Sequence, residues 1–447
     1  MAQNLGTRDL ERVLGAGSLF SVAIGSTIGA GVMSLMGVAI GMTGRSVVLS
    51  LFVAALITIL QTVPRILIGG TVRLRGGAYT QGLMLGGVLY GGIYLFATVF
   101  QNLSLAVFAL SFADYTAYFI PGIPRRLMAV VILTVFYLIN VAGVSNMARV
   151  QRLIVVVIIA SLILFAVFGL PKVRPGYFKE PGFYTDGFLG MLRAGALMLY
   201  AVYGAGNIIN LSAQAKNPTR DIPLVCIVVT LFVALLYALM SVVASGVLPL
   251  DEVAGKPLTA VAEAVLPTPI FLFFMVGGAL FALAANLNSL FATAPVSALQ
   301  GSIDGWFPKK LSYISPRFKT PVVWLSIFYI IGLIPIFTGL DISDVMNLVL
   351  VVSQVLGIAG NFLIIRLPKV IPKEWAASKF HLSYPVLVIV AILSAGAGVF
   401  TGVVMIARSS LRLIVLNLIA IALILAFCLW RMKSGKVTTP EISYETE

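Results

Sequence analysis

The chain has 447 residues, of which 60% are hydrophobic and only 10% are charged. A soluble protein would carry about 25% charged residues, so the composition predicts an integral membrane protein. Two cysteines and a single histidine argue against a disulfide scaffold, a thiolate zinc or iron–sulfur site and most histidine-based metal chemistry.

In chain order, the apolar runs predict twelve membrane spans, each long enough to cross about 30 Å of hydrocarbon. The runs are continuously apolar rather than alternating, so we expect helices and not a β-barrel. Residues 1–12 are polar and precede an apolar run longer than a leader core, so no cleavable leader is expected. The predicted spans are residues 13–42, 46–72, 84–113, 125–145, 150–170, 188–215, 222–248, 268–299, 321–339, 343–366, 383–406 and 409–431.

The basic residues predict the orientation. If both termini are cytoplasmic, 20 of the 30 Lys and Arg residues fall inside and 10 outside. This bias, together with anionic lipid headgroups, accounts for the net charge of +14, so no nucleic-acid partner is expected. We therefore expect a multi-pass protein of the cell membrane. Its cytoplasmic ends would be the segment 1–12 and a polar, disordered tail over residues 432–447.

Few ionisable side chains fall inside the predicted spans. Arg65, Asp114 and Arg193 lie near span ends, where long side chains can reach the interface. A relay of buried acids and bases, as in many proton pumps, is therefore not expected.

The polar content of the first span is clustered in the run Gly25–Gly31, GSTIGAG. Glycine frees the backbone from helical geometry, and Ser and Thr compete for its hydrogen bonds. An unwound stretch here would expose free N–H groups at one half-helix and free C=O groups at the other, which suits a zwitterion such as an amino acid. The alternative is close helix packing, because Gly25 and Gly29 also form a G-x-x-x-G spacing.

A second break is predicted in the sixth span, at Tyr200–Asn207, YAVYGAGN. Interruptions at corresponding positions of two halves indicate a transporter with inverted repeats and a midplane binding site. The expected fold is therefore an all-α membrane protein with a five-plus-five inverted repeat, unwound first and sixth helices and two further helices. The repeats would occupy residues 13–170 and 188–366, and the two further helices residues 383–431.

Several motifs, in order along the chain, resemble those of the amino acid–polyamine–organocation superfamily. More closely, they resemble its L-amino-acid-transporter-type permeases, which include bacterial alanine–serine–cysteine exchangers. The first-span GSTIGAGVM is similar to the G-S-x-I-G-x-G-I motif of that family. The other matching segments are Arg75–Tyr79 (RGGAY), Lys216–Pro223 (KNPTRDIP), Asp304–Pro308 (DGWFP) and Lys319–Val322 (KTPV).

The resemblance implies a substrate site at the two breaks. Tyr200 falls where relatives place an aromatic gate, although a lipid-interface or core tyrosine is the alternative. The implied carboxylate ligands are the amides and hydroxyl around Ser26, Thr27, Ile28, Gly29 and Gly31, and the implied amine ligands are carbonyls at Ala23, Ile24 and Tyr200 or Tyr203. Gly204 is a further substrate-binding candidate at the second break. Asn207, Asn286, Asn288 and Ser289 are candidates for the cavity wall, Asn286 and Ser289 also for coupling, and each has an alternative role as an interhelical hydrogen-bond partner.

Three positions depart from the family pattern. Ungapped alignment places Ile158 where exchangers often carry a lysine that ties the first and eighth spans together, which leaves the coupling open. Gln214 replaces a usual glutamate, and Ala205 replaces a tryptophan found in some relatives. None of these positions supplies a counter-charge for a cationic side chain, so neutral amino acids are favoured over arginine or polyamines.

Two arginines after the second span, Arg73 and Arg75, are candidate gate charges that would pair with Asp221 or Asp304. The alternative is a basic loop that faces lipid headgroups. Gly86–Gly87 and Gly91–Gly92 in the third span predict close helix packing rather than a phosphate loop, since no Walker-type lysine follows.

The sequence thus predicts a secondary transporter that exchanges neutral L-amino acids by alternating access. A proton- or sodium-coupled symporter on the same fold is the first alternative, and an amine or polyamine transporter, a channel or a substrate sensor is less favoured. No enzymatic motif, cofactor, metal site or accessory subunit is predicted. The expected partners are the amino acid and the membrane lipids.

Overall fold

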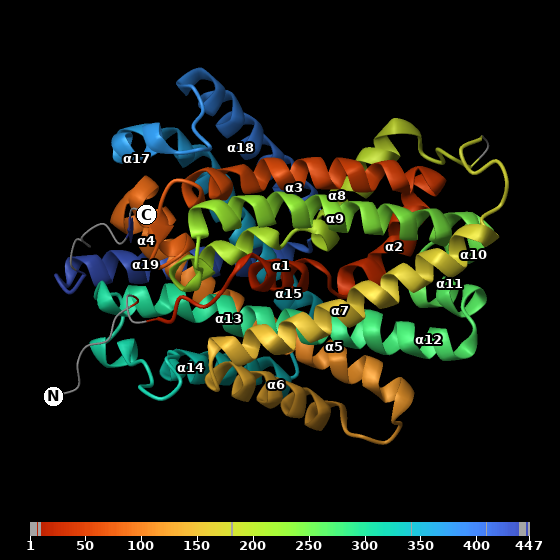
Figure 1. Cartoon of the computed structure of the whole chain (residues 1–447), viewed down its shortest axis with the longest axis horizontal. Helices are drawn as coiled ribbons and strands as arrows, with labels where there is room; N and C mark the ends of the chain where they lie inside the picture. The colour runs from red at the N-terminus through yellow and green to blue at the C-terminus, as the bar shows by residue number, and fades with distance from the viewer. Residues whose placement is uncertain are drawn as a thin grey trace.

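The computed structural model describes residues 7, 10–179, 182–340, 342–407, 409–437 and 444–445, without the side chains of Ala30, Tyr200 and Ser343. Helices make up nearly all of this part of the chain and run side by side along the long axis of the molecule (Figure 1). The longer helices are α1 (Ala16–Thr27), α2 (Ala30–Thr43), α3 (Val47–Gly69), α4 (Ala78–Gln101), α5 (Ser104–Phe119), α6 (Arg125–Val141), α7 (Val144–Gly169), α8 (Gly187–Val202), α9 (Pro218–Gly246), α13 (Phe281–Ile303), α14 (Val322–Thr338), α15 (Ile342–Leu363), α18 (Tyr384–Ala407) and α19 (Leu411–Lys433).

Shorter elements connect these helices. The 3₁₀ helix η4 (Ala205–Gln214) follows α8, and the π-helix η5 (Met275–Leu280) joins α12 (Thr268–Phe274) to α13. The others are η2 (Gly44–Ser46), η3 (Leu170–Lys172), α10 (Leu250–Val253), α11 (Leu258–Val265), η6 (Lys309–Ser312), η7 (Ile364–Arg366), α16 (Leu367–Val370) and α17 (Pro372–Ala377).

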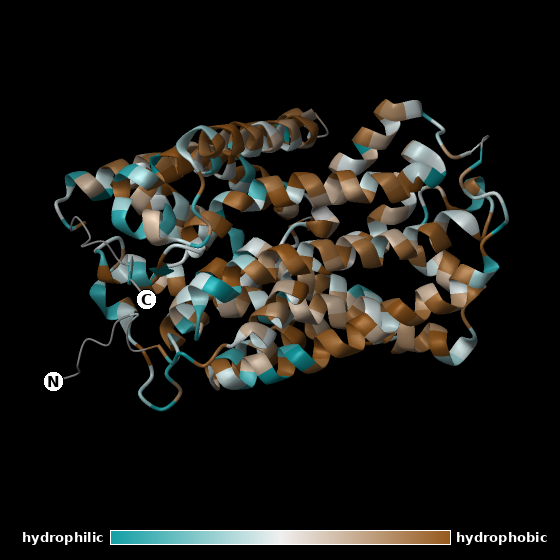
Figure 2. Ribbon diagram, turned by 45° about the horizontal axis from the view of Figure 1, so that its top comes forward, coloured by the Kyte–Doolittle hydropathy of each residue, from teal (hydrophilic) through white to brown (hydrophobic). Residues whose placement is uncertain are grey.

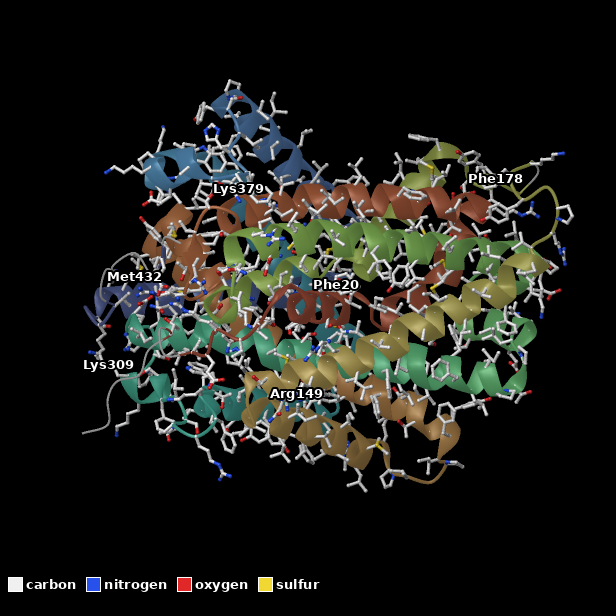
Figure 3. The ribbon with its side chains drawn as sticks, in the orientation of Figure 1. Phe20, Arg149, Phe178, Lys309, Lys379 and Met432 are labelled. Carbon is white, nitrogen blue, oxygen red and sulfur yellow. The ribbon has the colours of Figure 1, made fainter. Side chains whose placement is uncertain are left out.

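The helices are apolar enough for a membrane protein. Within the described residues, eight helical stretches have the length and hydropathy to cross a bilayer. Three shorter apolar helices, Ala16–Thr27, Gly187–Leu199 and Val322–Thr338, accompany them. Hydrophobic residues cover the helices over most of their length, while hydrophilic residues gather at the two ends of the bundle (Figure 2). Lys309 and Met432 lie at one end and Phe178 at the other (Figure 3). The count of twelve spans stays a prediction.

The third predicted span is less regular than its apolar sequence suggests. Gly87 in α4 has φ 82° and ψ −179°, which is not helical. A Cβ added at Gly82 would lie 3.6 Å from the Cα of Gly91, whereas nine residues of a straight helix span about 13 Å. The chain therefore bends sharply at Gly87, so these glycines allow a break in the helix as well as close packing.

The composition predicted a disordered tail, but part of the tail is ordered. Residues Tyr444–Glu445 form β2, which pairs antiparallel with β1 (Arg73–Leu74). The Glu445 carboxylate lies 2.6 Å from Arg12 and 3.1 Å from Arg75. Partial burial alone would raise the pKa of Glu445, but these two positive charges outweigh burial and lower it. The carboxylate that contacts Arg75 thus comes from the tail, not from the predicted Asp221 or Asp304.

Candidate functional site

The first predicted span is interrupted in the middle. Helix α1 ends at Thr27, about 18 Å from its start, and α2 begins at Ala30. Between them, Ile28 (φ −78°, ψ 115°) and Gly29 (φ −145°, ψ −166°) are extended. Because the helix stops, the last carbonyls of α1 have no N–H group four residues later to bond with. In the same way, the first N–H groups of α2 have no carbonyl four residues earlier. Two helix ends of opposite partial charge therefore face each other across two residues.

The sixth predicted span is interrupted in the same way. Helix α8 ends at Val202, Tyr203 is extended, and Gly204 adopts φ 155° and ψ −32° before η4 begins. A φ in this range is strained for any residue with a Cβ. The break falls where the Tyr-Gly-Ala-Gly run predicts it, and glycine supplies the conformation that the break requires.

The two interruptions touch. A Cβ added at Gly204 would lie 2.1 Å from the carbonyl oxygen of Ser26 and 2.9 Å from the Cα of Thr27. At their other ends, the Lys216 N–H after η4 donates to the Leu14 carbonyl before α1 at 2.8 Å. These two contacts together show that α1 and η4 run in opposite directions. The structure thus brings the carbonyl end of α1 against the break after α8, in the interior of the bundle (Figure 1).

The residues predicted to bind the two poles of an amino acid differ in their availability. The Thr27 hydroxyl donates to the Ala23 carbonyl at 2.8 Å, and the Ile28 N–H donates to the Ile24 carbonyl at 2.7 Å. The Ile24 carbonyl keeps one lone pair, but the Ala23 carbonyl also accepts the helical N–H of Thr27, and the Thr27 hydroxyl and the Ile28 N–H are already used within α1. The donors that the break leaves free belong to the start of α2.

Ser26 and Gly31 lie on opposite sides of the break. Both are partly exposed, as is Gly29 between them. Gly31 is the second residue of α2, so its N–H is one of the first four that a helix leaves unbonded. Of the predicted carboxylate ligands, Gly29 and Gly31 therefore match the geometry best.

Helix α13 closes one side of the first break. Asn286 donates from Nδ2 to the Ile28 carbonyl at 2.9 Å, and a Cβ on Gly29 would come within 3.0 Å of the same nitrogen. Ser289, one turn later and nearly fully buried, donates to the Val22 carbonyl at 3.2 Å. Asn286 therefore lies at the first break, and its role in a cavity wall stays a prediction, whereas Ser289 makes the interhelical bond that was its alternative role.

A further polar connection between α1 and α13 comes from Gln151, a residue that no sequence motif singles out as a candidate. Gln151 of α7 donates from Nε2 to the Ser21 carbonyl (3.3 Å), the Ala285 carbonyl (3.4 Å) and the Ser289 hydroxyl (3.1 Å). Its Oε1 accepts from Asn288 at 2.6 Å. A Cβ on Gly25 would lie 1.8 Å from Gln151 Nε2, so only a glycine leaves room for this amide.

Ile158, the position predicted for a coupling residue, is instead fully buried in the apolar core. Its side chain offers no group that could hold an ion or a proton. Asn288 is also fully buried and bonds to the Met147 carbonyl at 3.2 Å, so it lines no cavity. Gln151 is thus the described residue of α7 that makes polar contacts with both α1 and α13.

The second break presents one aromatic side chain to open space. Tyr203 is 36% exposed although its neighbours in sequence are buried, and its hydroxyl accepts from Arg65 Nη1 at 2.9 Å. Asn207 is partly exposed, and its N–H donates to the Gly204 carbonyl at 3.0 Å. The side chain of Tyr200, the predicted gate, lies outside the described part of the chain. Its gating role stays a prediction.

Three of the recognised motifs meet at one end of the bundle. Tyr79 donates from its hydroxyl to Asp304 at 2.7 Å, and Arg73 donates to the Ala215 carbonyl at 2.6 Å and the Lys216 carbonyl at 3.1 Å. Burial raises the pKa of Asp304 to about 6, although hydrogen bonds from Tyr79 and Gln300 counteract it. These residues, which lie in the motifs or within two residues of them, join the segments that flank the interrupted helices.

Comparison with known proteins finds relatives over most of the chain. A family model described as amino acid permease matches residues 14–428. The branched-chain amino acid permease BcaP of Bacillus subtilis (strain 168) is 27% identical over 348 residues, or 72% of this chain and 74% of that protein. The vacuolar cationic amino acid transporter 4 of Arabidopsis thaliana is 25% identical over 72% of this chain and 58% of its own length. The methylthioribose transporter of Bacillus subtilis (strain 168) is 25% identical over 62% of this chain and 58% of its own length. The family match spans both helix interruptions.

Proposed function

Because the chain belongs to the amino acid permease family, whose model matches residues 14–428, we propose that it exchanges neutral L-amino acids by alternating access. As a member of this family, the chain is a multi-pass membrane protein that transports amino acids, and it is not an enzyme. The observation that carries the finer proposal is the contact between Gly204 and the Ser26 carbonyl, which places the two helix interruptions side by side.

In this proposal the interruptions bind the two charged groups that all amino acids share. The N–H groups at the start of α2, at Gly29 and Gly31, receive the carboxylate, because a helix N-terminus favours an anion. The carbonyl groups at the end of α1 and at Tyr203 receive the ammonium group. Ala23, Ile24, Ser26 and the Tyr200 gate complete the proposed site.

The proposed topology has twelve spans, made of two inverted repeats of five spans each and two further helices, with both termini in the cytoplasm. The contacts of Lys216 with Leu14 and of Gly204 with Ser26 show that α1 and η4 run in opposite directions, which supports the inversion. Rocking of one repeat-derived bundle against the other would then switch the site between the two faces of the membrane.

A neutral substrate is favoured by the side chains at the breaks. Ser26, Asn207 and Asn286 are uncharged, and none of them supplies a counter-charge for a cationic side chain. A relative named for branched-chain amino acids supports the same choice, although another is named for cationic ones.

The experiment that tests exchange uses proteoliposomes with and without internal L-leucine. We expect uptake of radiolabelled L-leucine to be at least tenfold faster into preloaded vesicles, and no accumulation under a proton or sodium gradient alone. Accumulation driven by an ion gradient in empty vesicles would replace exchange by symport. Binding without any flux would favour a sensor.

A further inference from the structure

A cavity lies beside the second helix interruption, between α3, α4 and α15. About 350 Å³ lies between its walls, a figure that includes space open to solvent, and the part that water-sized groups can enter is about 20 Å³. Its polar wall consists of Arg65, Gln81, Tyr90, Tyr94 and Asn361. The bend of α4 at Gly87 shapes this space, because residues on both sides of the bend line it.

Arg65 brings a positive charge into this wall from within an apolar stretch, Gly31–Gly69. Its guanidinium donates to the Tyr203 hydroxyl at 2.9 Å and the Tyr94 hydroxyl at 3.5 Å, and lies 5.8 Å from the centre of the Tyr203 ring. Among the described residues, no carboxylate lies within ion-pair distance of Arg65. The two hydroxyl groups are neutral, so they do not neutralise the charge of Arg65, and they use only part of the N–H donors of its guanidinium.

Gln81 provides a second, independent sign of a missing ligand. Its side chain is 8% exposed and its Oε1 has no hydrogen-bond partner among the described residues. A buried acceptor without a donor is unfavourable unless a ligand or water satisfies it. The same wall thus offers a charged donor, Arg65, and an open acceptor, Gln81.

The cavity adjoins the proposed substrate pathway. Tyr203, which accepts the hydrogen bond from Arg65, directly precedes the strained Gly204 of the break. A Cβ on Gly206, two residues further, would lie 2.9 Å from Arg65 Nη1. A solute that leaves the break on this side therefore passes within reach of the guanidinium.

We propose that the Arg65–Gln81 cavity is a second solute site that takes the carboxylate of an amino acid on Arg65 and its ammonium group on Gln81. The proposal rests on the proposed function, because it treats the cavity as part of the same pathway. It adds a substrate class: the unneutralised charge of Arg65 attracts carboxylates and repels cationic side chains, so basic amino acids are excluded.

The test compares Arg65→Gln and Arg65→Lys with the wild-type protein and with Arg193→Gln. Arg193 also lies on an apolar helix but is exposed, which makes it a matched control. Two readouts are used: inhibition of L-leucine exchange, and thermal stabilisation of the purified protein. The probes are 4-methylpentanoate, which has the carboxylate of leucine but no amine, and L-lysine.

In the wild type and in Arg193→Gln, 4-methylpentanoate should stabilise the protein and slow exchange, and L-lysine should compete poorly. In Arg65→Gln, at least tenfold more 4-methylpentanoate should be needed for either effect, and L-lysine should compete at least tenfold better relative to L-leucine. Arg65→Lys keeps the charge but loses the fork geometry, so it should need several-fold more of the anion.

Unchanged responses in Arg65→Gln would overturn the proposal, as would the same losses in Arg193→Gln. If Arg65→Gln does not fold, an unchanged anion dependence in Arg65→Lys overturns it equally. Thermal stabilisation by 4-methylpentanoate requires no transport, so it tests the Arg65–Gln81 site independently of the proposed function. The proposed function fails if the wild-type protein does not transport L-leucine.

Discussion

Replacing Gly204 by alanine should lower amino acid exchange by at least tenfold while leaving the protein in the membrane. The new Cβ would meet the Ser26 carbonyl at 2.1 Å and the Thr27 Cα at 2.9 Å. Both are backbone atoms, which cannot rotate away, and alanine is also strained at φ 155°. The two interruptions must therefore separate, and the binding groups with them. Exchange of L-leucine in proteoliposomes, per folded molecule, measures the effect.

Gly122→Ala is the matched control for this variant. Gly122 also has a positive φ, 98°, but a Cβ there has no neighbour within 4 Å. The Gly122→Ala variant therefore introduces backbone strain without a clash at the site, and it should exchange L-leucine at nearly the wild-type rate. If Gly204→Ala exchanges L-leucine as fast as Gly122→Ala and the wild type, the contact between the breaks is not needed for transport.

Replacing Gln151 by leucine should cost about 1–3 kcal/mol of stability and also slow exchange by at least tenfold. The substitution removes the donors to Ser21, Ala285 and Ser289, and leaves Asn288 without its 2.6 Å acceptor. Because these bonds join α1 to α13 near the first break, their loss should loosen the half-helix that ends in the site. Thermal unfolding and exchange, measured on the same preparation, separate the two effects.

Gln61→Leu tests whether the loss of any buried amide has the same consequence. Gln61 is similarly buried and donates to the Ala397 carbonyl at 3.2 Å and the Thr401 hydroxyl at 2.8 Å, on α18 rather than α1. It should lower the melting temperature but preserve exchange per folded molecule. If Gln151→Leu behaves like Gln61→Leu, the Gln151 contacts serve stability alone.

Local sequence was sufficient to locate the helix interruptions but not their surroundings. The glycine-rich runs around Gly29 and Gly204 contain the residues that a break needs, so the positions of both breaks could be predicted. The use of the Thr27 hydroxyl and the Ile28 N–H inside α1 depends on the residue at which the helix ends, and pattern alone does not fix such boundaries.

The coupling position illustrates a second limit. Ile158 and Gln151 are seven residues apart, which is nearly two turns, so they lie on the same face of α7 about 10 Å apart. Counting along the sequence leads to Ile158, whereas the α7 side chain that hydrogen-bonds to both α1 and α13 is Gln151. Only the packing of α7 against α1 and α13 shows that the amide of Gln151 fills the space left by Gly25.

Contacts between distant parts of the chain were not predictable. The pairing of Glu445 with Arg75 joins residues 370 positions apart, and composition suggested only a disordered tail. Arg65 lies near a span end, where a long side chain can reach the interface, yet it turns toward Tyr203 on another segment. Such choices depend on which neighbours the assembled bundle supplies.

The central claim is that the two interruptions bind the ammonium and the carboxylate of one amino acid, and a competition panel tests it most directly. Radiolabelled L-leucine exchange would be measured against L-leucine, isopentylamine, which lacks the carboxylate, and 4-methylpentanoate, which lacks the amine. We expect both analogues to compete at least tenfold more weakly than L-leucine. If either analogue competes as well as L-leucine, one of the two poles is not bound and the account is contradicted.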